Sequence, residues 1–482
     1  MRLVLVFGVV GQLLRVFSVA FVPPVLLALF DRQWWSAFHF TLAAVASLVA
    51  GALASKGLPR TPVFHRSEAL AVVSFAWLSV ALFAAVPYLA AGLSPVDALF
   101  ESMSGLTTTG ATILTDFSRY SRAFFLWRAM TQWFGGLGVI ALFVVVLPRL
   151  GIAGRQLFFA EASGAPSEAV SPKVRHGAQR LWILYSILTA LLATSLVVTG
   201  MPFYEAVLHS LTTMPAGGFS PHPQSIAGYA NPKAEWILVV FMLLAGASFP
   251  LQYKVFTGRI LGFFQDGEFI FYFAIMAGGA LGVACVLAAG LPNLEQLRMG
   301  AFQAASLMSS TGYASTDYEL WPDAAKALLI VVMIVGGCAG SAAGGQKSIR
   351  VLLVSKHALR EITRVLHPRA VLPLRYKRSP IPDDIMRAVF LLVGLFMLGH
   401  FTVGTLLVLG GADLVTGYSA AIACLGNIGP AFGPAGPMGS YADFPTLSKL
   451  LLTIAMWAGR LEIVTVLAML HRDVWRGIRL RG

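Results

Sequence analysis

Long apolar runs follow one another along almost the whole chain. A segment needs about 20 predominantly apolar residues to cross the roughly 30 Å hydrocarbon core of a bilayer. Ten windows reach that length, and we predict a transmembrane helix for each of them. They are residues 4–29, 37–55, 68–91, 124–147, 179–199, 235–256, 268–290, 324–345, 385–409 and 445–470.

Four shorter apolar segments lie between these windows, at residues 95–106, 202–213, 296–308 and 412–425. They are too short to cross the bilayer, and lengths of this kind are typical of re-entrant segments. We therefore predict four short helices that enter the membrane and turn back.

Composition supports the membrane assignment. Apolar residues make up 57% of the chain and charged residues only 12%, whereas a soluble domain has about 25% charged residues. The mean hydropathy is +0.76. These values exclude soluble enzymes and nucleic-acid-binding proteins, so we expect a multi-pass protein that is embedded in a lipid bilayer and binds no nucleic acid.

The charge distribution predicts the orientation. The net charge is +13, and Lys and Arg accumulate in cytoplasmic loops of membrane proteins. If both termini are cytoplasmic, 25 of the 35 Lys and Arg residues fall on that side. The outward loops then carry twelve carboxylates, among them Asp97, Glu101 and Asp413. These either concentrate cations at an entrance or are ordinary solvated loop residues.

After the first two windows the chain repeats one unit four times: a span, a short apolar segment, a polar turn with glycine, and a second span. The turns align on four glycines spaced 94 to 117 residues apart. Their sequences are SGLTTTGAT (104–112), TTMPAGGFS (212–220), SLMSSTGYAS (306–315) and CLGNIGPAFG (424–433), with the aligned glycines at Gly110, Gly218, Gly312 and Gly429.

Such a unit suits a cation site. The C-terminal end of a short helix carries about half a negative charge, and extended backbone after it presents carbonyl oxygens that replace an ion's hydration shell. Glycine tolerates positive φ and lets backbone approach closely. The alternative is that the four glycines are ordinary helix C-caps, although their recurrence at one place in a repeated unit favours a cation site.

These motifs resemble the Trk/Ktr/HKT superfamily of potassium transporters, and within it the bacterial TrkH/TrkG-type membrane subunits. The resemblance covers nearly the whole chain, including two N-terminal spans before the repeats. The motifs that carry it are TTTGAT (107–112), GGFS (217–220), STGY (310–313), GNIGPAFG (426–433), QWFGGLG (132–138), GGCAGSAAGG (336–345) and GRLE (459–462).

The resemblance implies an all-α polytopic membrane fold. Ten transmembrane helices and four re-entrant pore helices would form four pseudosymmetric helix–pore-loop–helix repeats around one pore, preceded by two N-terminal helices. The expected divisions are two N-terminal helices in 1–60, pore repeat 1 in 61–150, repeat 2 in 151–260, repeat 3 with an intramembrane gating loop in 261–365, and repeat 4 in 366–482.

The resemblance also implies the function, which is potassium uptake across the bacterial inner membrane through a filter of backbone carbonyls. Glycine at all four filter positions goes with potassium selectivity in this superfamily, and serine at the first goes with sodium preference. The expected K⁺ filter residues are Thr108, Thr109, Gly110, Gly217, Gly218, Thr311, Gly312, Tyr313, Asn427, Ile428 and Gly429.

A gate is expected below the filter. Residues 336–345 contain five glycines, and a helix interior loses about 1 kcal/mol for each. They indicate either close helix packing through small residues or a break in the helix, and the resemblance favours a break that gates permeation. This chain reads SAAGGQK at 341–347 where the family commonly reads STGGGIK. The expected gate residues are Gly336, Gly337, Gly340, Ser341, Gly344, Gly345, Lys347 and Arg460.

Arg460 lies within the last predicted span, where an arginine costs roughly 2.5–3.5 kcal/mol on insertion scales and usually faces a polar interior. Glu462 is two positions further on, so it points elsewhere around a helix and is a poor partner. The resemblance implies that Arg460 projects into the pore as a positive barrier. The alternative is that its side chain reaches the interface.

The expected ligands and partners follow. K⁺ is the transported ion, with Rb⁺ and Na⁺ as further candidates, and the chain has no organic cofactor. Segment 346–383 is rich in Lys and Arg and has no nucleotide-binding fingerprint. The resemblance therefore implies a homodimer regulated by a cytosolic TrkA-type nucleotide-binding ring. A plain positive-inside loop explains the same charge.

Two other functional classes remain as alternatives. A secondary transporter coupled to H⁺ or Na⁺ would need carboxylates near the membrane midplane, and Glu462 is the only acidic residue well inside a predicted span. An intramembrane enzyme would need a nucleophile–base pair or metal ligands at that depth. Only His400 lies there, so we expect no enzyme.

Overall fold

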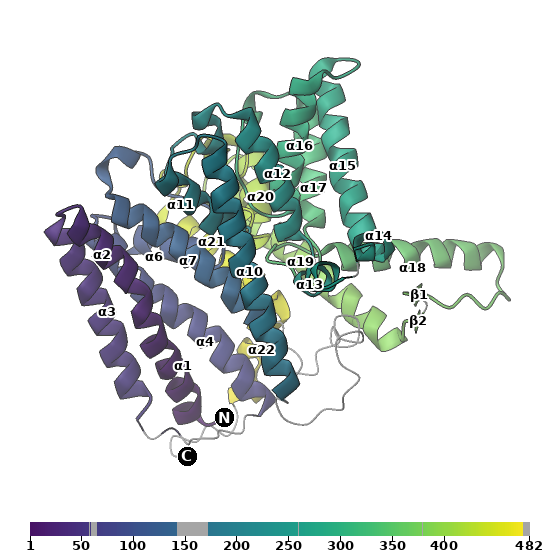
Figure 1. The fold of residues 1–482 in the computed structure, drawn as a ribbon. Helices are drawn as coiled ribbons and strands as arrows, with labels where there is room; N and C mark the ends of the chain where they lie inside the picture. The colour runs from purple at the N-terminus through teal and green to yellow at the C-terminus, as the bar shows by residue number, and fades with distance from the viewer. Residues whose placement is uncertain (57, 59–64, 142–171, 259, 378, 476–482) are drawn as a thin grey trace.

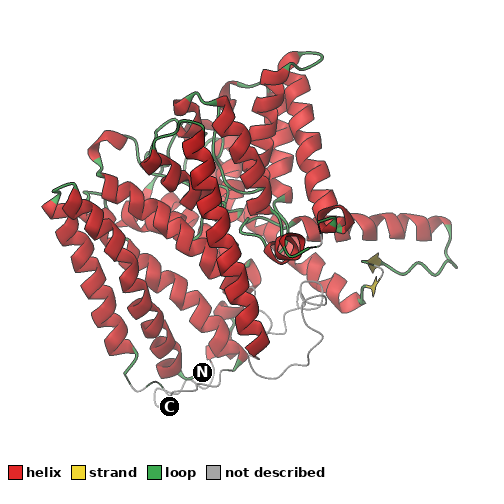
Figure 2. Cartoon of the chain, viewed as in Figure 1, coloured by secondary structure: helices red, strands yellow, loops and turns green. Residues whose placement is uncertain are grey.

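The computed structural model describes residues 1–475 except for 57, 59–64, 142–171, 259 and 378 (Figure 1). Helices make up nearly all of the regular structure (Figure 2). The described residues form one small sheet, in which β1 (Arg375–Tyr376) pairs antiparallel with β2 (Ser379–Pro380). The end of predicted span 124–147 and most of the basic segment 149–180 lie outside the described residues.

The N-terminal part is a helical hairpin that precedes the repeats. α1 (Leu3–Phe17), a short 3₁₀ turn and α2 (Val22–Phe30) form one span, and α3 (Trp34–Ala54) returns beside it. α1 and α3 cross closely, because a Cβ added at Gly11 would collide with the carbonyl oxygen of Gly51. Small residues at a crossing allow this approach.

Each of the four short apolar segments is a helix. α6 starts after the capping residue Ser94, whose hydroxyl accepts from the Asp97 amide, and α20 starts after Asp413, which accepts from Thr416. The bounds of the short helices are α6 Pro95–Leu106, α11 Phe203–Thr213, α16 Leu294–Met308 and α20 Leu414–Leu425.

The outer ends of these helices explain some of the outward carboxylates. Asp97, Glu205 and Glu295 lie in the first turns of α6, α11 and α16, and Asp413 is the N-cap of α20. Hydrogen bonding to Thr416 lowers the pKa of Asp413. Negative charge stabilises a helix N-terminus, so four of the twelve carboxylates have a structural role that neither sequence interpretation included.

Longer helices flank each short helix. The first helices of the repeats are α4 Arg66–Ala84 with α5 Val86–Ala90, α10 Pro172–Val198, α15 Gly267–Ala288 and α19 Asp383–Leu409. The second helices are α7 Arg122–Ala141, α12 Pro232–Gly246 with α13 Phe249–Phe256, α17 Asp323–Val335, and α21 Thr446–Arg460 with α22 Ile463–Leu470. The remaining helices are α14 Gly262–Gln265, α18 Ser348–Leu366 and α23 Arg472–Trp475.

In three of the four repeats, the second helix breaks inside a window that we predicted as one span. α12 and α13 meet at 109°, and α21 and α22 at 110°. Pro250 lies in the first turn of α13, where proline is favoured, and Gln252 donates to the carbonyls of Leu244 and Ala247 at the end of α12. α17 ends at Val335, so the expected break in the glycine-rich segment is present. Windows 235–256, 324–345 and 445–470 are therefore not single straight helices.

Among the described residues, six helices are long and apolar enough to cross a membrane, or up to eight if each bent pair is one span. The ten predicted spans stay a prediction. The six are Leu3–Phe30, Trp34–Ala54, Ser67–Ala90, Gly177–Val198, Gly267–Ala288 and Asp383–Leu409.

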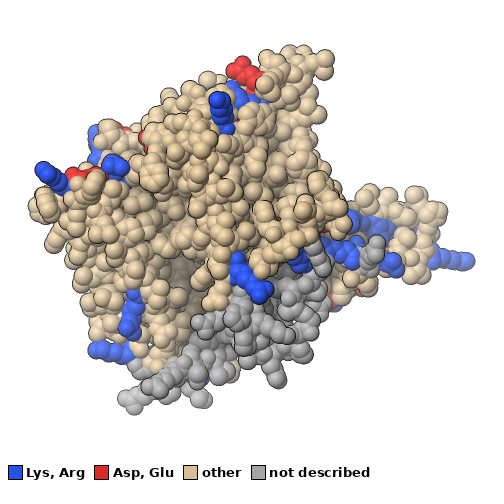
Figure 3. All heavy atoms as spheres, viewed as in Figure 1, with Lys and Arg blue, Asp and Glu red and all other residues tan. Residues whose placement is uncertain are grey.

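The two described ends of the chain lie together. Met1 and Val6 pack in one apolar cluster with Met469, Val474 and Trp475. In Figure 3, Lys, Arg, Asp and Glu gather toward the two ends of the helices and along α18, and the band between them is almost free of charge. This pattern is typical of a protein that spans a bilayer.

Candidate ion pathway

The four aligned glycines meet in a closed ring. A Cβ added to any of them would collide with a carbonyl oxygen of the next repeat along the chain, and the fourth repeat closes back onto the first. The pairs are Gly110 with Gly217, Gly218 with Thr311, Gly312 with Ile428, and Gly429 with Thr109. We call residues 108–110, 216–218, 310–312 and 427–429 the carbonyl ring.

The same turn leads into the ring in every repeat. The residue two places before each glycine is left-handed, with φ between 51° and 58°, namely Thr108, Ala216, Ser310 and Asn427. The amide of the following residue donates to the carbonyl five residues earlier, at 2.8–2.9 Å. This is the Schellman cap of a helix, and none of the capping residues is glycine. The interpretation of the aligned glycines as ordinary C-caps is therefore wrong.

Backbone handedness alternates through the ring. In each segment the left-handed cap is followed by a residue without positive φ and then by a glycine at φ 77° to 99°. Positive φ recurs at every second residue of each segment, so the four segments share one backbone pattern around the ring.

Side-chain hydroxyls support two of the segments in the same way. Thr107 and Thr109 share a hydroxyl hydrogen bond of 2.7 Å, and Ser309 and Thr311 share one of 2.8 Å at the equivalent positions. The side-chain amide of Asn427 donates from Nδ2 to the Thr109 hydroxyl at 3.0 Å and so joins repeat 4 to repeat 1.

Two tyrosine hydroxyls form hydrogen bonds at the ring or at the helix that leads into it. The Tyr313 hydroxyl lies 2.5 Å from that of Thr212 and donates to the His209 carbonyl. The Tyr441 hydroxyl donates to the Gly429 carbonyl at 2.8 Å. All of the predicted filter residues lie in the carbonyl ring except Tyr313, which follows its third segment.

An extended segment crosses the inner side of the ring. Residues 336–347, which we call the inner loop, connect α17 to α18 and are almost entirely buried. The Gly344 amide donates to the Ser310 hydroxyl at 2.6 Å, and a Cβ on Gly344 would collide with the Gly426 carbonyl oxygen. The inner loop therefore lies directly against the helix caps of repeats 3 and 4.

The inner loop also pairs with repeat 2. The Cys338 amide donates to the Gly246 carbonyl at 2.8 Å, and the Phe249 amide donates to the Gly340 carbonyl at 3.0 Å. These bonds use backbone groups that the break between α12 and α13 leaves open. Contacts with three repeats hold the loop across the inner face of the ring.

Arg460 lies at the end of α21, beside the inner loop. Its Nη1 donates to the Ala342 carbonyl at 2.9 Å, while Nε and Nη2 have no hydrogen-bond partner among the described residues. Lys347 donates to the Ala343 carbonyl. The expectation of a mid-helix Arg460 is wrong, because α21 ends at this residue and the chain bends.

Glu462 is not free at the membrane centre. It pairs with Arg350 of α18 at 2.7 Å and occupies a left-handed position, φ 66°, at the bend. The sequence prediction that it is a poor partner for Arg460 agrees with this pairing.

Comparison with known proteins identifies the family. The family model TrkH, described as a cation transport protein, matches residues 36–473. The Trk system potassium uptake protein TrkH of Halomonas elongata is 35% identical, and the match covers 99% of this chain and 100% of the relative. TrkG of Escherichia coli is 33% identical, with 97% of each chain covered. The crystal structure of the potassium transporter TrkH from Vibrio parahaemolyticus superposes with a TM-score of 0.90 at 31% identity, covering 99% of this chain and 100% of that one.

The chain belongs to the TrkH family. The resemblance stated from the sequence is thereby confirmed, as are a mostly helical, multi-pass bacterial membrane fold and membership of a transporter family rather than an enzyme family. The number of spans, the site residues and the partners stay predictions.

Sequence reasoning missed two side chains that touch the ring of this TrkH-family member, Tyr441 and Gln132. The buried Gln132 of α7 donates from Nε2 to the Gly217 carbonyl at 2.7 Å, and its Oε1 accepts from the Phe219 amide at 3.1 Å. The motif 132–138 marked the family but gave no role for this residue. A glutamine inside an apolar window was the available signal, because buried amides need partners.

A buried ion pair was also missed. The sequence placed Glu101 in an outward loop, but it lies in α6 with 0% of its side chain exposed and pairs with Arg128 of α7 at 2.7 Å. Arg128 also donates to the Ser220 carbonyl, and Glu101 accepts from the Ile113 amide. The pair joins the segments that leave the ring in repeats 1 and 2.

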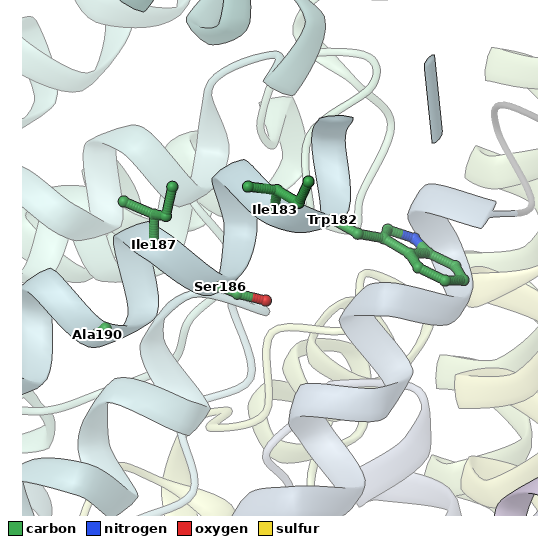
Figure 4. A pocket seen from close by; sticks show the side chains of 5 residues that line it. All are labelled: Trp182, Ile183, Ser186, Ile187 and Ala190. Carbon is green, nitrogen blue, oxygen red and sulfur yellow. The ribbon is translucent and has the colours of Figure 1, made fainter. Parts of the chain in front are cut away.

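An open hollow lies on α10. Figure 4 shows its lining by Trp182, Ile183, Ser186, Ile187 and Ala190. None of them belongs to the carbonyl ring or the inner loop. Its largely apolar lining suits a lipid-facing surface.

Proposed function

We propose that this TrkH-family chain takes up potassium ions through the carbonyl ring. The observation that carries the proposal is ring closure, since each aligned glycine lies against a carbonyl of the next repeat. An ion that enters a ring of this kind exchanges water for carbonyl oxygens. The relatives named as potassium uptake proteins support the choice of ion.

Helix ends add to the attraction. The C-terminal ends of α6, α11, α16 and α20 lead directly into the ring, and each carries about half a negative charge. Four such ends stabilise one monovalent cation without a fixed carboxylate in the ring. With glycine at all four aligned positions, we propose selectivity for K⁺ and Rb⁺ over Na⁺.

The inner loop is proposed as the gate. It lies against the helix caps of repeats 3 and 4 and bonds to repeat 2, so an ion leaving the ring inward would meet it. Arg460 adds a positive charge, and two unit charges about 6 Å apart repel by roughly 3 kcal/mol at an effective dielectric of about 20. Uptake then requires that the loop and Arg460 move.

Regulation is proposed to come from a partner. The chain has no nucleotide-binding fingerprint, so control by a nucleotide requires a cytosolic protein of the TrkA type, for which the basic segment 346–383 is a candidate surface. We further propose a homodimer in the inner membrane with both termini in the cytoplasm.

Uptake of ⁸⁶Rb⁺ by purified protein in liposomes tests the function. We expect uptake that K⁺ competes with and Na⁺ does not, at equal concentrations. Equal competition by Na⁺ would contradict a potassium filter. Uptake that occurs only with an imposed H⁺ or Na⁺ gradient would favour the alternative of coupled secondary transport.

A further inference from the structure

A buried carboxyl group touches the inner loop at Ala339. Glu268 is the second residue of α15 and has 8% of its surface exposed. One of its carboxylate oxygens accepts a hydrogen bond of 2.6 Å from the amide of Ala339 in the inner loop. A buried amide that loses its acceptor costs about 1–3 kcal/mol, so this contact is an attachment point for the loop.

The same helix end is tied to the β1–β2 hairpin. Asp266 caps α15 by accepting from the amides of Glu268 and Phe269 through Oδ1. Its other oxygen, Oδ2, pairs with Lys377 of the hairpin at 2.8 Å. One short stretch of chain thus connects the hairpin to the inner loop through charged and hydrogen-bonding groups.

Apolar packing makes the same connection independently. Ala339 of the inner loop belongs to a buried cluster that includes Leu374, and Tyr376 and Ile381 pack against that cluster. Figure 1 shows the two strands below α18. The hairpin and Ala339 of the inner loop therefore share one apolar cluster.

We propose that Glu268 is a positioning residue that holds the inner loop in its blocking place, and that the β1–β2 hairpin is coupled to the loop through the Lys377–Asp266 ion pair. The effect on transport rests on the proposed role of the inner loop as a gate. Displacing the hairpin would weaken the end of α15 and release Ala339, and the loop could then leave the ring.

Two readouts on the full-length protein separate this proposal from the gate itself. The first is basal ⁸⁶Rb⁺ flux into liposomes. The second is the rate at which a maleimide modifies Cys338, which precedes Ala339 and is 1% exposed, followed by mass spectrometry of its peptide. Release of the loop raises the Cys338 rate whether or not the loop controls flux.

Substitutions at Glu268 test the hydrogen bond. Glu268→Ala removes the acceptor, and we expect both basal flux and the Cys338 rate to rise about tenfold, as for a buried amide left without its hydrogen-bond partner. Glu268→Gln keeps an acceptor oxygen at the same reach and should leave both readouts close to wild type. If Glu268→Ala does not fold, Glu268→Asp withdraws the oxygen by one methylene and should raise both readouts.

Substitution at Lys377 tests the coupling. Lys377→Ala breaks the ion pair, and we expect both readouts to rise about two- to threefold, in line with a partly exposed pair. Arg375→Ala is the matched control, because it removes the same charge from an exposed position of the hairpin and should change neither readout.

An unchanged Cys338 rate in a folded Glu268→Ala protein would overturn the positioning role. So would an equal rise in Glu268→Gln. A faster Cys338 reaction with unchanged flux would support Glu268 as the residue that holds the loop and would instead contradict the loop as the gate. Equal effects of Lys377→Ala and Arg375→Ala would remove the hairpin from the proposal.

Discussion

At the scale of single residues, the aligned glycines occupy positions where a side chain would collide with the backbone of the next repeat. Gly110 has φ 83° and lies against the Gly217 carbonyl, so it needs both a left-handed backbone and an absent Cβ. The motif alone allowed a plain helix cap as well. Only the caps at Thr108 and its counterparts separate the two explanations, and a capping residue that is not glycine has little signature in the sequence.

Gly110→Ser should lower the preference for K⁺ over Na⁺. Its Cβ would displace the Gly217 carbonyl, and a loss of about 1.4 kcal/mol in discrimination is a tenfold change, so we expect at least that drop in the Rb⁺/Na⁺ uptake ratio. Gly92→Ser is the matched control, since Gly92 has φ 95° but open space around it. Equal ratios in Gly110→Ser and wild type would remove Gly110 from the filter.

Arg460→Ala should increase Rb⁺ flux. A guanidinium keeps its charge at every accessible pH, and the repulsion of roughly 3 kcal/mol given above corresponds to about a hundredfold, which is an upper value because water screens it. Since Arg460 also donates to the Ala342 carbonyl, regulation should weaken as flux rises. A folded variant with wild-type or lower flux would make Arg460 a structural anchor.

At the scale of elements, the apolar pattern located the short helices closely but not the bends. α6 spans Pro95–Leu106, the predicted range, because its polar ends interrupt the pattern. The breaks after Gly246 and Arg460 lie inside windows whose mean hydropathy still predicts a single span. The local indications were Pro250 for the first break and the charged residues Arg460 and Glu462 for the second.

The sequence predicted the surroundings of charged residues less accurately than it predicted the short helices. Glu101 was assigned to an outward loop, whereas it forms a buried pair with Arg128 of α7. Pairing between residues on different helices depends on how the helices pack, and a single sequence does not contain that arrangement.

Breaking the buried pair should destabilise the protein. Removing one partner leaves an uncompensated charge, at a cost of about 3–5 kcal/mol, so Glu101→Gln and Arg128→Met should each lower the melting temperature in detergent clearly. The double variant should lose less than the sum of the two, because the partners interact. Additive losses would show that the two side chains act independently.

Shortening the inner loop should raise basal flux. Deleting Ala342 and Ala343 removes the carbonyls to which Arg460 and Lys347 donate and draws the loop away from the ring. The measurement is ⁸⁶Rb⁺ flux without a partner protein, with unchanged gel-filtration behaviour as the control for folding. Flux that stays at the wild-type level would favour helix packing over gating.

At the scale of the whole molecule, the fourfold arrangement follows from the internal repeat. Four units of the same kind were visible in the sequence, and the structure joins them into a ring in chain order, with repeat 4 next to repeat 1. What the repeat did not reveal is its asymmetry. Among the described residues, only repeat 3 inserts a long loop against the ring, and Gln132 of α7 donates a hydrogen bond to the second segment.

The most direct test of the account is to locate the ion. Crystals grown in Rb⁺ should show an anomalous diffraction peak on the axis of the carbonyl ring, within coordination distance of carbonyl oxygens from all four repeats. Crystals grown in K⁺ should show an ion at the same place, and crystals grown in Na⁺ should not. An ordered ring without a peak, with Rb⁺ bound elsewhere, would contradict the account.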